Sequence, residues 1–362
     1  ELPEDIKALK DTVRKFVDRE LIPLERKSME GLDLKPELRA TLEKKARDLG
    51  LWMLDVPEEY GGMGLPMLGQ VVVWEELGRT IALPPRGPGI FGPEPMPLLF
   101  TLNDEQKQRY LLPVLRGEKR TAFAQTEPDA GADPGMMRTT AVRQGDHYVV
   151  NGMKRFITHA NKADFFQLVV ATDRSKGSRG GLSVLLVDAD SPGVKILRGF
   201  EKVSGDVSYQ IAFDEVKVPV ENLVGKEGDG MRNAQTWITT GRLRQASGGL
   251  GTAQRCLELA TAYAKQRVTF GAPLAERQAV QFMIADIFMA HQMGQLYVYQ
   301  TAWKADHKKL SRHESFIAKI HGTELGFKAA DRCMQIHGGT GLTTDLPIEH
   351  FWRTRRSFMI TE

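Results

Sequence analysis

The feature that most constrains the fold is a double change of hydrophobic periodicity along the chain. In the first part apolar residues recur at helical spacing, as Ile6 and Val13 illustrate. From residue 121 short alternating or continuous apolar runs lie between turn residues, which is typical of strands. From residue 230 the helical spacing returns. The pattern therefore predicts a helical domain over 1–120, a β-barrel or sandwich domain over 121–229 and a helical bundle over 230–362.

Length, charge and cysteine content exclude several classes of protein. A chain of 362 residues with a formal net charge of +3 and no long basic run has no electrostatic support for binding nucleic acid. No apolar run reaches the length of a transmembrane helix. The two cysteines, Cys256 and Cys333, fall in expected helices, where small apolar packing residues are the ordinary reading. No cluster of His, Cys and carboxylate residues has metal-binding spacing, so no metal site is predicted.

Helices and strands are predicted from the same periodicity. In the first domain the expected helices cover 3–20, 35–49, 71–81 and 103–115. In the last domain they cover 231–251, 252–269, 278–304 and 313–335, which makes a four-helix bundle. Strands are expected at 122–126, 138–143, 147–150, 153–158, 165–171, 182–188, 194–197, 208–213 and 216–219. Because strands and long helices do not alternate, a parallel Rossmann sheet is not expected.

Residues that can bind a ligand gather at strand ends between residues 121 and 161. Thr126 and Thr158 each end a predicted strand, where a rigid scaffold can direct a hydroxyl toward a ligand. Phe156 lies two residues before Thr158, and strand alternation predicts the same face for both side chains. Taken alone, this stretch also fits a β-meander with ordinary turns.

The stretch resembles the flavin-binding signature of the acyl-CoA dehydrogenase family. The residues that carry the resemblance are Thr126-Glu127-Pro128, Ala130-Gly131-Ala132-Asp133 and Lys154-Arg155-Phe156-Ile157-Thr158. The resemblance implies that the first loop lies along FAD and the acyl thioester, and that Thr158 gives a hydroxyl to the flavin N5 edge. Phe156 replaces a stacking Trp, His159 replaces a common Asn, and Ala132 replaces a Ser that helps to hold CoA.

Two segments in the last domain extend this resemblance. In Gln266-Arg267-Val268-Thr269-Phe270-Gly271 an arginine can clamp a pyrophosphate and an aromatic ring can cover an adenine. The alternative is a helix C-terminus capped by Arg267 and ended by Gly271. The loop His337-Gly338-Gly339-Thr340-Gly341 lets backbone amides approach a ligand closely, although it is not a G-x-G-x-x-G fingerprint. Both segments resemble family loops that reach the flavin across a subunit boundary, whereas His337 itself is expected to pack or cap.

The same resemblance assigns residues to the chemistry. Arg242 matches an arginine that lines the thioester site, and Glu362 falls at the position of the carboxylate that removes the α-proton. Thr240 stands where some members place their base, and a threonine cannot serve in that role. Thr239 replaces an Asp of some medium-chain members. The residues implied in cofactor binding are Phe123, Gln125, Thr126, Phe156, Thr158, Arg267, Phe270, Gln278, Gln335, Gly338 and Gly339. Substrate binding is assigned to Ala132 and Arg242.

The implied activity is FAD-dependent α,β-dehydrogenation of an acyl-CoA to the trans-2-enoyl-CoA. Electrons would pass to an electron-transfer flavoprotein, and the assembly would be a homodimer or homotetramer, cytoplasmic in a bacterium or in the mitochondrial matrix of a eukaryote. The natural C-terminus is expected beyond residue 362. Two alternatives stay open: a flavin oxidase or monooxygenase of the nitroalkane oxidase type, against which Glu362 and Arg242 argue, and an FAD-binding protein without catalysis. The sequence does not indicate the acyl chain.

Overall fold

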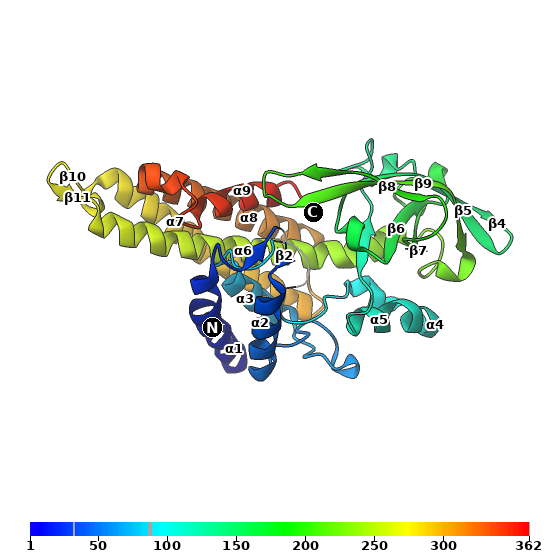
Figure 1. The fold of residues 1–362 in the computed structure, drawn as a ribbon, viewed down its shortest axis with the longest axis horizontal. Coiled ribbons are helices and arrows are strands. Elements are labelled where there is room, and N and C mark those ends of the chain that lie inside the picture. The colour runs from blue at the N-terminus through cyan, green and yellow to red at the C-terminus, as the bar shows by residue number, and fades with distance from the viewer. Residues whose placement is uncertain (32, 86–88, 362) are drawn as a thin grey trace. The chain divides into compact units, whose positions relative to one another are not determined.

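The computed structural model describes residues 1–31, 33–85 and 89–361, which form two compact units. One unit takes the chain up to Gly92, residues 203–205 and everything from Thr239 onward. The other takes Pro93–Lys202 and Asp206–Ile238. Along the chain, helices come first, strands follow, and helices return, so the predicted order of helical, β and helical parts is confirmed (Figure 1).

The first unit begins with three helices, α1 (Glu4–Phe16), α2 (Pro36–Asp48) and α3 (Met67–Leu77), and the short strands β1 (Met29–Glu30) and β2 (Asp33–Leu34). Acidic residues occupy the first turn of α1 and basic residues its last turn, which complements the helix dipole. Two buried carboxylates of α3 are paired with α1, since Lys10 Nζ lies 2.9 Å from Glu75 and Arg14 Nη2 lies 2.9 Å from Glu76. These pairs connect the N-terminal helices.

The rest of this unit is built on long helices. They are α6 (Gly230–Gln266, from Thr239 in this unit), α7 (Gln278–Asp306), α8 (Arg312–His337) and the shorter α9 (Ile348–Phe358). A hairpin of β10 (Val268–Thr269) and β11 (Ala272–Pro273) joins α6 to α7. The prediction of separate helices over 231–251 and 252–269 is wrong, because α6 is one helix of 37 residues. The fourth helix beside α6, α7 and α8 is α9.

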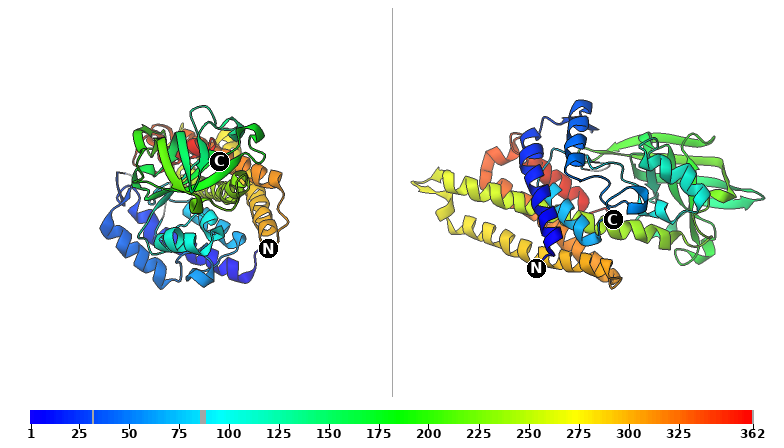
Figure 2. Two further views of the ribbon diagram at one scale, coloured as in Figure 1. Left: turned by 90° about the vertical axis from the view of Figure 1, so that its right-hand side faces the viewer. Right: turned by 90° about the horizontal axis from the view of Figure 1, so that it is seen from below.

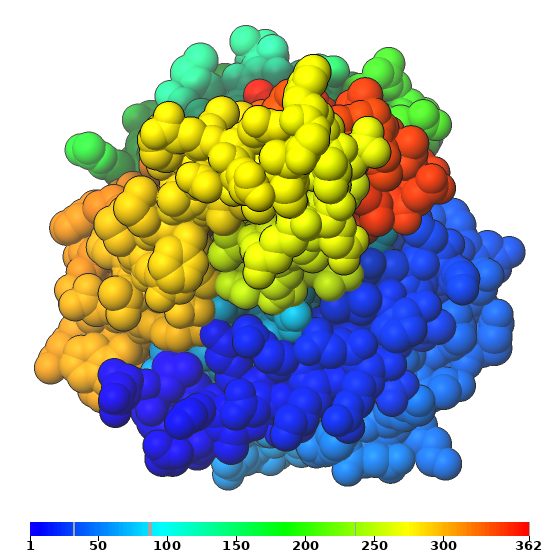
Figure 3. Space-filling view, turned by 90° about the vertical axis from the view of Figure 1, so that its left-hand side faces the viewer, coloured from blue at the N-terminus to red at the C-terminus, as the bar shows by residue number. Residues whose placement is uncertain are grey.

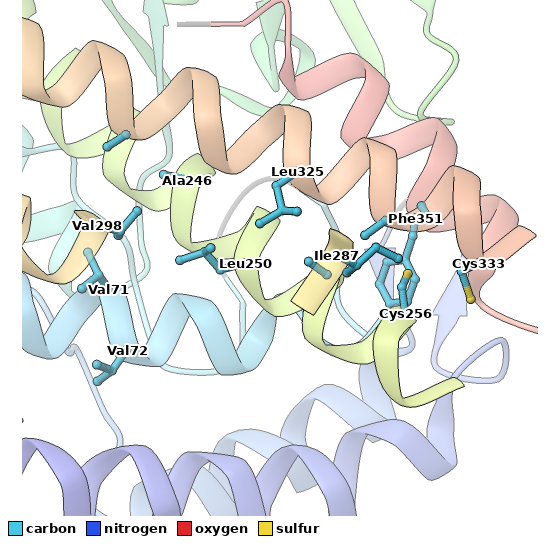
Figure 4. Close-up of a cluster of buried hydrophobic side chains, with 14 of the residues drawn as sticks. Val71, Val72, Ala246, Leu250, Cys256, Ile287, Val298, Leu325, Cys333 and Phe351 are labelled. Atoms are coloured by element: carbon cyan, nitrogen blue, oxygen red, sulfur yellow. The ribbon is translucent and has the colours of Figure 1, made fainter. Parts of the chain in front are cut away.

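Glycines in the middle of α6 resemble a helix end in the sequence but serve close packing. A Cβ on Gly249 would collide with the Gly322 carbonyl of α8, and one on Gly251 with the Glu75 carbonyl of α3. A Cβ on Gly326 would lie 2.9 Å from Gly249 Cα. Figure 4 shows Leu250 and Leu325 directed into the core that these helices share. The helix therefore continues because neighbouring backbones occupy the space of the missing side chains.

The second unit is a curled sheet, seen from further directions in Figure 2. Its strands are β3 (Thr121–Ala124), β4 (Thr140–Gln144), β5 (His147–Thr158), β6 (Phe165–Ala171), β7 (Leu182–Asp188), β8 (Val194–Glu201) and β9 (Val207–Pro219). Their order is β3-β6-β4-β5-β9-β8, with β7 pairing β6. Pairing is antiparallel except where β6 meets β3 and β4. The short helices α4 (Asp104–Gln106) and α5 (Leu112–Leu115) belong to this unit.

Two pairs of predicted strands are single strands. Residues 147–150 and 153–158 belong to β5, and residues 208–213 and 216–219 belong to β9. Gly152 and Glu215 look like breaks in the sequence, but both lie within the ladder of these two strands, which shifts register there. No helix among the described residues has the length and apolarity needed to cross a membrane.

Candidate functional site

The loop after β3 is fixed to β5 by a buried ion pair. Lys154 Nζ donates to Glu127 Oε1 at 2.7 Å and to the Gln125 carbonyl at 3.0 Å. The Glu127 carboxylate also accepts from the backbone N–H groups of Arg138, at 2.6 Å, and Thr139, at 3.0 Å. One carboxylate therefore joins both ends of the loop to the sheet. The sequence motif contains both charged residues, but nothing in its spacing identifies them as partners.

Burial and mutual attraction act together on the two charges. Burial lowers the pKa of Lys154 to about 8, and the attraction of Glu127 partly opposes that shift. Burial alone raises the pKa of Glu127, but the charge of Lys154 and the donated hydrogen bonds outweigh it, so the net shift is downward. The pair is therefore charged at neutral pH and holds the loop rigidly.

The predicted residues of this loop lie beside β5. The Arg155 N–H donates to the Thr126 carbonyl at 2.7 Å, which sets Thr126 next to Phe156. The Phe123 ring stacks on Trp237 with centroids 5.1 Å apart. Ala132 is exposed. Gln125 Oε1 is buried yet accepts no hydrogen bond from the described residues, which is costly unless a ligand supplies a donor.

A bulge shapes the end of β5. Lys154 pairs with Ile211 and Ile157 with Tyr209, so β5 has one residue more than β9 across this interval. Phe156 adopts a left-handed backbone, with φ of 60°, and 49% of it is exposed. The regular alternation of side chains along a strand therefore does not hold at Phe156. The prediction that alternation alone places Phe156 and Thr158 on one face rests on a wrong premise.

Phe156 and Thr158 are connected through the neighbouring strands instead. The Phe156 ring lies 5.0 Å from the Phe200 ring, and Phe200 pairs with Ser208 across β8 and β9. Ser208 pairs in turn with Thr158, with hydroxyl oxygens 3.4 Å apart. Directly paired residues share a sheet face, so these side chains form one row. The row presents an aromatic ring and two hydroxyls together.

In the helical unit, a second group of predicted residues lies around the hairpin β10–β11. Figure 3 shows the hairpin protruding at the top of that face, in yellow. The Phe270 ring at its tip is 99% exposed. Arg277 Nη2 braces the hairpin by donating to the Thr269 carbonyl at 2.6 Å. Arg267 and Gln278 are exposed on either side of it.

The glycine-containing segment follows the end of α8. Gln335, Gly338 and Gly339 are exposed, and a Cβ on either glycine would meet nothing within 4 Å. Gly338 has a φ of 57°, a conformation that favours glycine. His337 is buried, stacks on Tyr263 at 4.3 Å, and its Nδ1 lies 2.8 Å from the Cys333 carbonyl. The histidine therefore packs, as predicted, and the open backbone beside it is accessible to a ligand.

The residues assigned to the reaction itself lie on α6 or outside the described residues. The Arg242 guanidinium of α6 lies over the Phe316 ring of α8, 4.4 Å from its centroid. Thr239 and Thr240 precede it on α6 and are partly exposed. Glu362 lies outside the described residues. Within the described residues, no group of three His, Cys, Asp or Glu side chains could hold a metal ion.

Comparisons with known proteins cover the whole chain. Residues 3–118, 122–216 and 228–362 match the N-terminal, middle and C-terminal domains of acyl-CoA dehydrogenase, respectively. Subunit CarC of the caffeyl-CoA reductase–Etf complex of Acetobacterium woodii is 35% identical, over 99% of this chain and 94% of that protein. The mitochondrial short-chain specific acyl-CoA dehydrogenase of Rattus norvegicus is 34% identical, over 100% of this chain and 87% of that protein. The structure of butyryl-CoA dehydrogenase from Megasphaera elsdenii superposes with a TM-score of 0.84 at 28% identity, over 99% of this chain and 94% of that chain.

Proposed function

This chain belongs to the acyl-CoA dehydrogenase family, a family of flavoprotein oxidoreductases, and from that premise we propose that it binds FAD and desaturates an acyl-CoA thioester between Cα and Cβ. The observation that carries the proposal is the row of Phe156, Ser208 and Thr158 beside the loop that Glu127 and Lys154 hold. An exposed ring next to hydroxyls, on a braced strand, suits a planar cofactor with a polar edge.

The residues present fit FAD. The buried Gln125 Oε1 lacks a donor among the described residues, and the flavin ring system offers N–H groups. Arg267 is exposed beside the bare ring of Phe270, a combination that suits a pyrophosphate and an adenine. Gly338 and Gly339 leave their backbone open for close approach. When bound, FAD supplies the hydride acceptor; the chain supplies everything else.

The proposed mechanism gives the proton to Glu362. The α-proton of a thioester is weakly acidic, so a carboxylate must accept it while hydrogen-bond donors stabilise charge on the carbonyl oxygen. The backbone N–H of Glu362 is the donor that this chain provides. Arg355 and Arg356, which precede Glu362 in the sequence, are arginines and cannot accept a proton in its place. Enclosure by an acyl chain would raise the pKa of Glu362 toward neutrality and exclude water.

We propose that the working form is a homodimer or homotetramer. Four large apolar side chains of α7, spaced 7, 4 and 3 residues apart, are each more than half exposed: Phe282, Met289, Met293 and Leu296. That spacing places them on one helix face, where a second copy can cover them. Arg267, Phe270 and the Gln335–Gly339 segment would then reach the flavin of the partner subunit. FAD retention would therefore depend on assembly.

The proposed electron acceptor is an electron-transfer flavoprotein. The caffeyl-CoA reductase relative is named as a subunit of a complex with Etf, which supports the same class of partner for this chain. The relatives' names include both dehydrogenases and reductases of CoA thioesters, among them a (R)-benzylsuccinyl-CoA dehydrogenase of Thauera aromatica at 33% identity over 100% of this chain and 92% of that protein. Aryl and short straight chains are therefore both candidate substrates.

The test mixes purified, FAD-loaded protein anaerobically with short straight-chain, branched and aryl acyl-CoAs. Bleaching of the flavin absorbance, with formation of the trans-2-enoyl-CoA, is the expected result for at least one substrate. Protein that keeps FAD but is bleached by none of them would be a non-catalytic binder. Turnover that requires O2 and yields hydrogen peroxide would indicate an oxidase.

A further inference from the structure

The guanidinium of Arg155 lies against two aromatic rings that also contact each other, at the proposed flavin site. Its Cζ is 4.8 Å from the centroid of Phe156 and 4.8 Å from that of Phe200, and the two rings are tilted by 58° to each other. Arg198 covers Phe200 as well, with Cζ 4.0 Å from the centroid. Two cations and two rings thus form one cluster on the β unit.

Adjacent residues of a regular strand point to opposite faces, so contact between Arg155 and Phe156 requires a distortion. Two bulges supply it. The extra residue of β5 lies between Lys154 and Ile157, and β8 has an extra residue between Ile196 and Arg198. Both bulges lie opposite the same short segment of β9, so that Arg155 and Arg198 are redirected toward one place. Bulges commonly redirect side chains in this way beside active sites.

The distortion has an energetic cost. A bulky side chain at positive φ is strained and persists only where the surroundings enforce it. Phe156 is such a residue. The Arg155 Nε is buried and donates no hydrogen bond to the described residues. Neither Arg155 nor Arg198 forms an ion pair with a described carboxylate. Ring contacts, and not an ion pair, therefore hold the Arg155 charge at this position.

We propose that Arg155 is a positioning residue that acts through Phe156 to raise the reduction potential of bound FAD. The proposal rests on the proposed function, in which the flavin stacks on Phe156. A reduced flavin is richer in electrons than an oxidised one, so a nearby positive charge stabilises the reduced form more. The Arg155 charge contacts Phe156 directly, so only one ring separates it from a flavin stacked on Phe156. Arg198 acts on Phe200, one ring further away.

The experiment measures the midpoint potential of bound FAD in the FAD-loaded protein by equilibration with a redox dye. For Arg155→Gln we expect a fall of about 30 mV, which is tenfold in the equilibrium constant of a two-electron couple. Arg198→Gln is the matched control and should shift the potential by less than half as much. Arg155→Lys keeps the charge and should recover most of the shift. FAD content and thermal midpoint are measured in parallel.

The outcomes separate the two proposals. An unchanged potential in Arg155→Gln, with FAD bound and acyl-CoA bleaching intact, overturns the role of Arg155 and leaves the proposed function standing. An equal fall in Arg198→Gln also overturns it, because that result would describe a general effect of surface charge. If Arg155→Gln loses FAD, the midpoint potentials of Arg155→Lys and Arg155→Met are compared after both proteins are reconstituted with FAD. That comparison again contrasts a charged with an uncharged side chain. A purely structural role would change stability without changing the potential.

Discussion

Lys154 Nζ and Glu127 Oε1 lie 2.7 Å apart in the interior of the β unit, and neither side chain is more than 2% exposed. Each charge is tolerated only because the other is present, since a lone buried ion is strongly unfavourable. The pair also holds both ends of the loop that contains Gln125 and Thr126. The stability of the unit and the geometry of the proposed flavin site are therefore linked by one contact.

Replacing Lys154 with Met should destabilise the β unit by about 3–5 kcal/mol, because the Glu127 carboxylate would stay buried without a partner. Urea unfolding followed by tryptophan fluorescence measures the change. Lys195→Met is the control, since Lys195 is exposed on β8 of the same unit. A loss below about 1 kcal/mol, as for a surface pair, would show that the contact contributes little.

Acid should weaken the fold through Glu127. Its folded-state pKa is lowered, so the stabilisation is fully present above the unfolded value of about 4.3 and is lost as the pH falls through the lower folded value. Urea midpoints measured from pH 7 to pH 3 should therefore decline more steeply in the wild type than in Glu127→Gln. Parallel acid limbs in the two proteins would contradict this assignment.

Substituting Glu362 with Gln keeps its size but removes the accepting carboxylate. Loss of general-base assistance should slow flavin reduction by on the order of a hundredfold to ten-thousandfold, while FAD content is unchanged. Rapid anaerobic mixing with the best acyl-CoA gives the rate. Bleaching at close to the wild-type rate would mean that another group takes the α-proton.

The apolar face of α7 should be sensitive to charge. Because burying an unpaired carboxylate costs several kcal/mol, the double change Met293→Glu and Leu296→Glu should weaken association by at least about a hundredfold. Sedimentation gives the assembly state, and the ratio of flavin to protein absorbance gives FAD retention. Leu296→Met keeps the face apolar and should leave both unchanged. A flavin-replete monomer at low concentration would rule out the shared site.

Much of the fold could be predicted from the sequence because hydrophobic period reports directly on local structure. The runs that became α1 and α2 have helical spacing, and those that became β6 and β7 are continuous apolar runs between turns. Their predicted positions agree with the structure within a few residues. The single helix α6 was predicted as two helices that divide after Gly251. Only the neighbouring carbonyls of Gly322 and Glu75 explain the glycines at this point of the helix. Packing between distant segments leaves no local pattern.

In the proposed site, too, local features were predicted from the sequence and contacts between distant segments were not. The resemblance predicts a site at the segments around Thr126 and Phe156, since they are short and contiguous. The bulge at Phe156 was not readable, because it depends on a register shift against β9. The Lys154–Glu127 pair and the contact of Arg155 with two rings were missed for a similar reason. Charge partners and ring contacts are set by topology, and spacing along the chain does not encode them.

The glycine contacts of α6 have a consequence for how this protein can change over generations. A methyl group at Gly249 or Gly251 cannot be accommodated by turning a side chain, because the obstacle is the backbone of another helix. Only a shift of a whole helix would make room, and such a shift would disturb every layer of the core at once. Substitutions at these two positions are therefore not reached by single steps. A library that randomises α6 uniformly would lose most of its members at these two positions, and fixing them beforehand would recover that diversity.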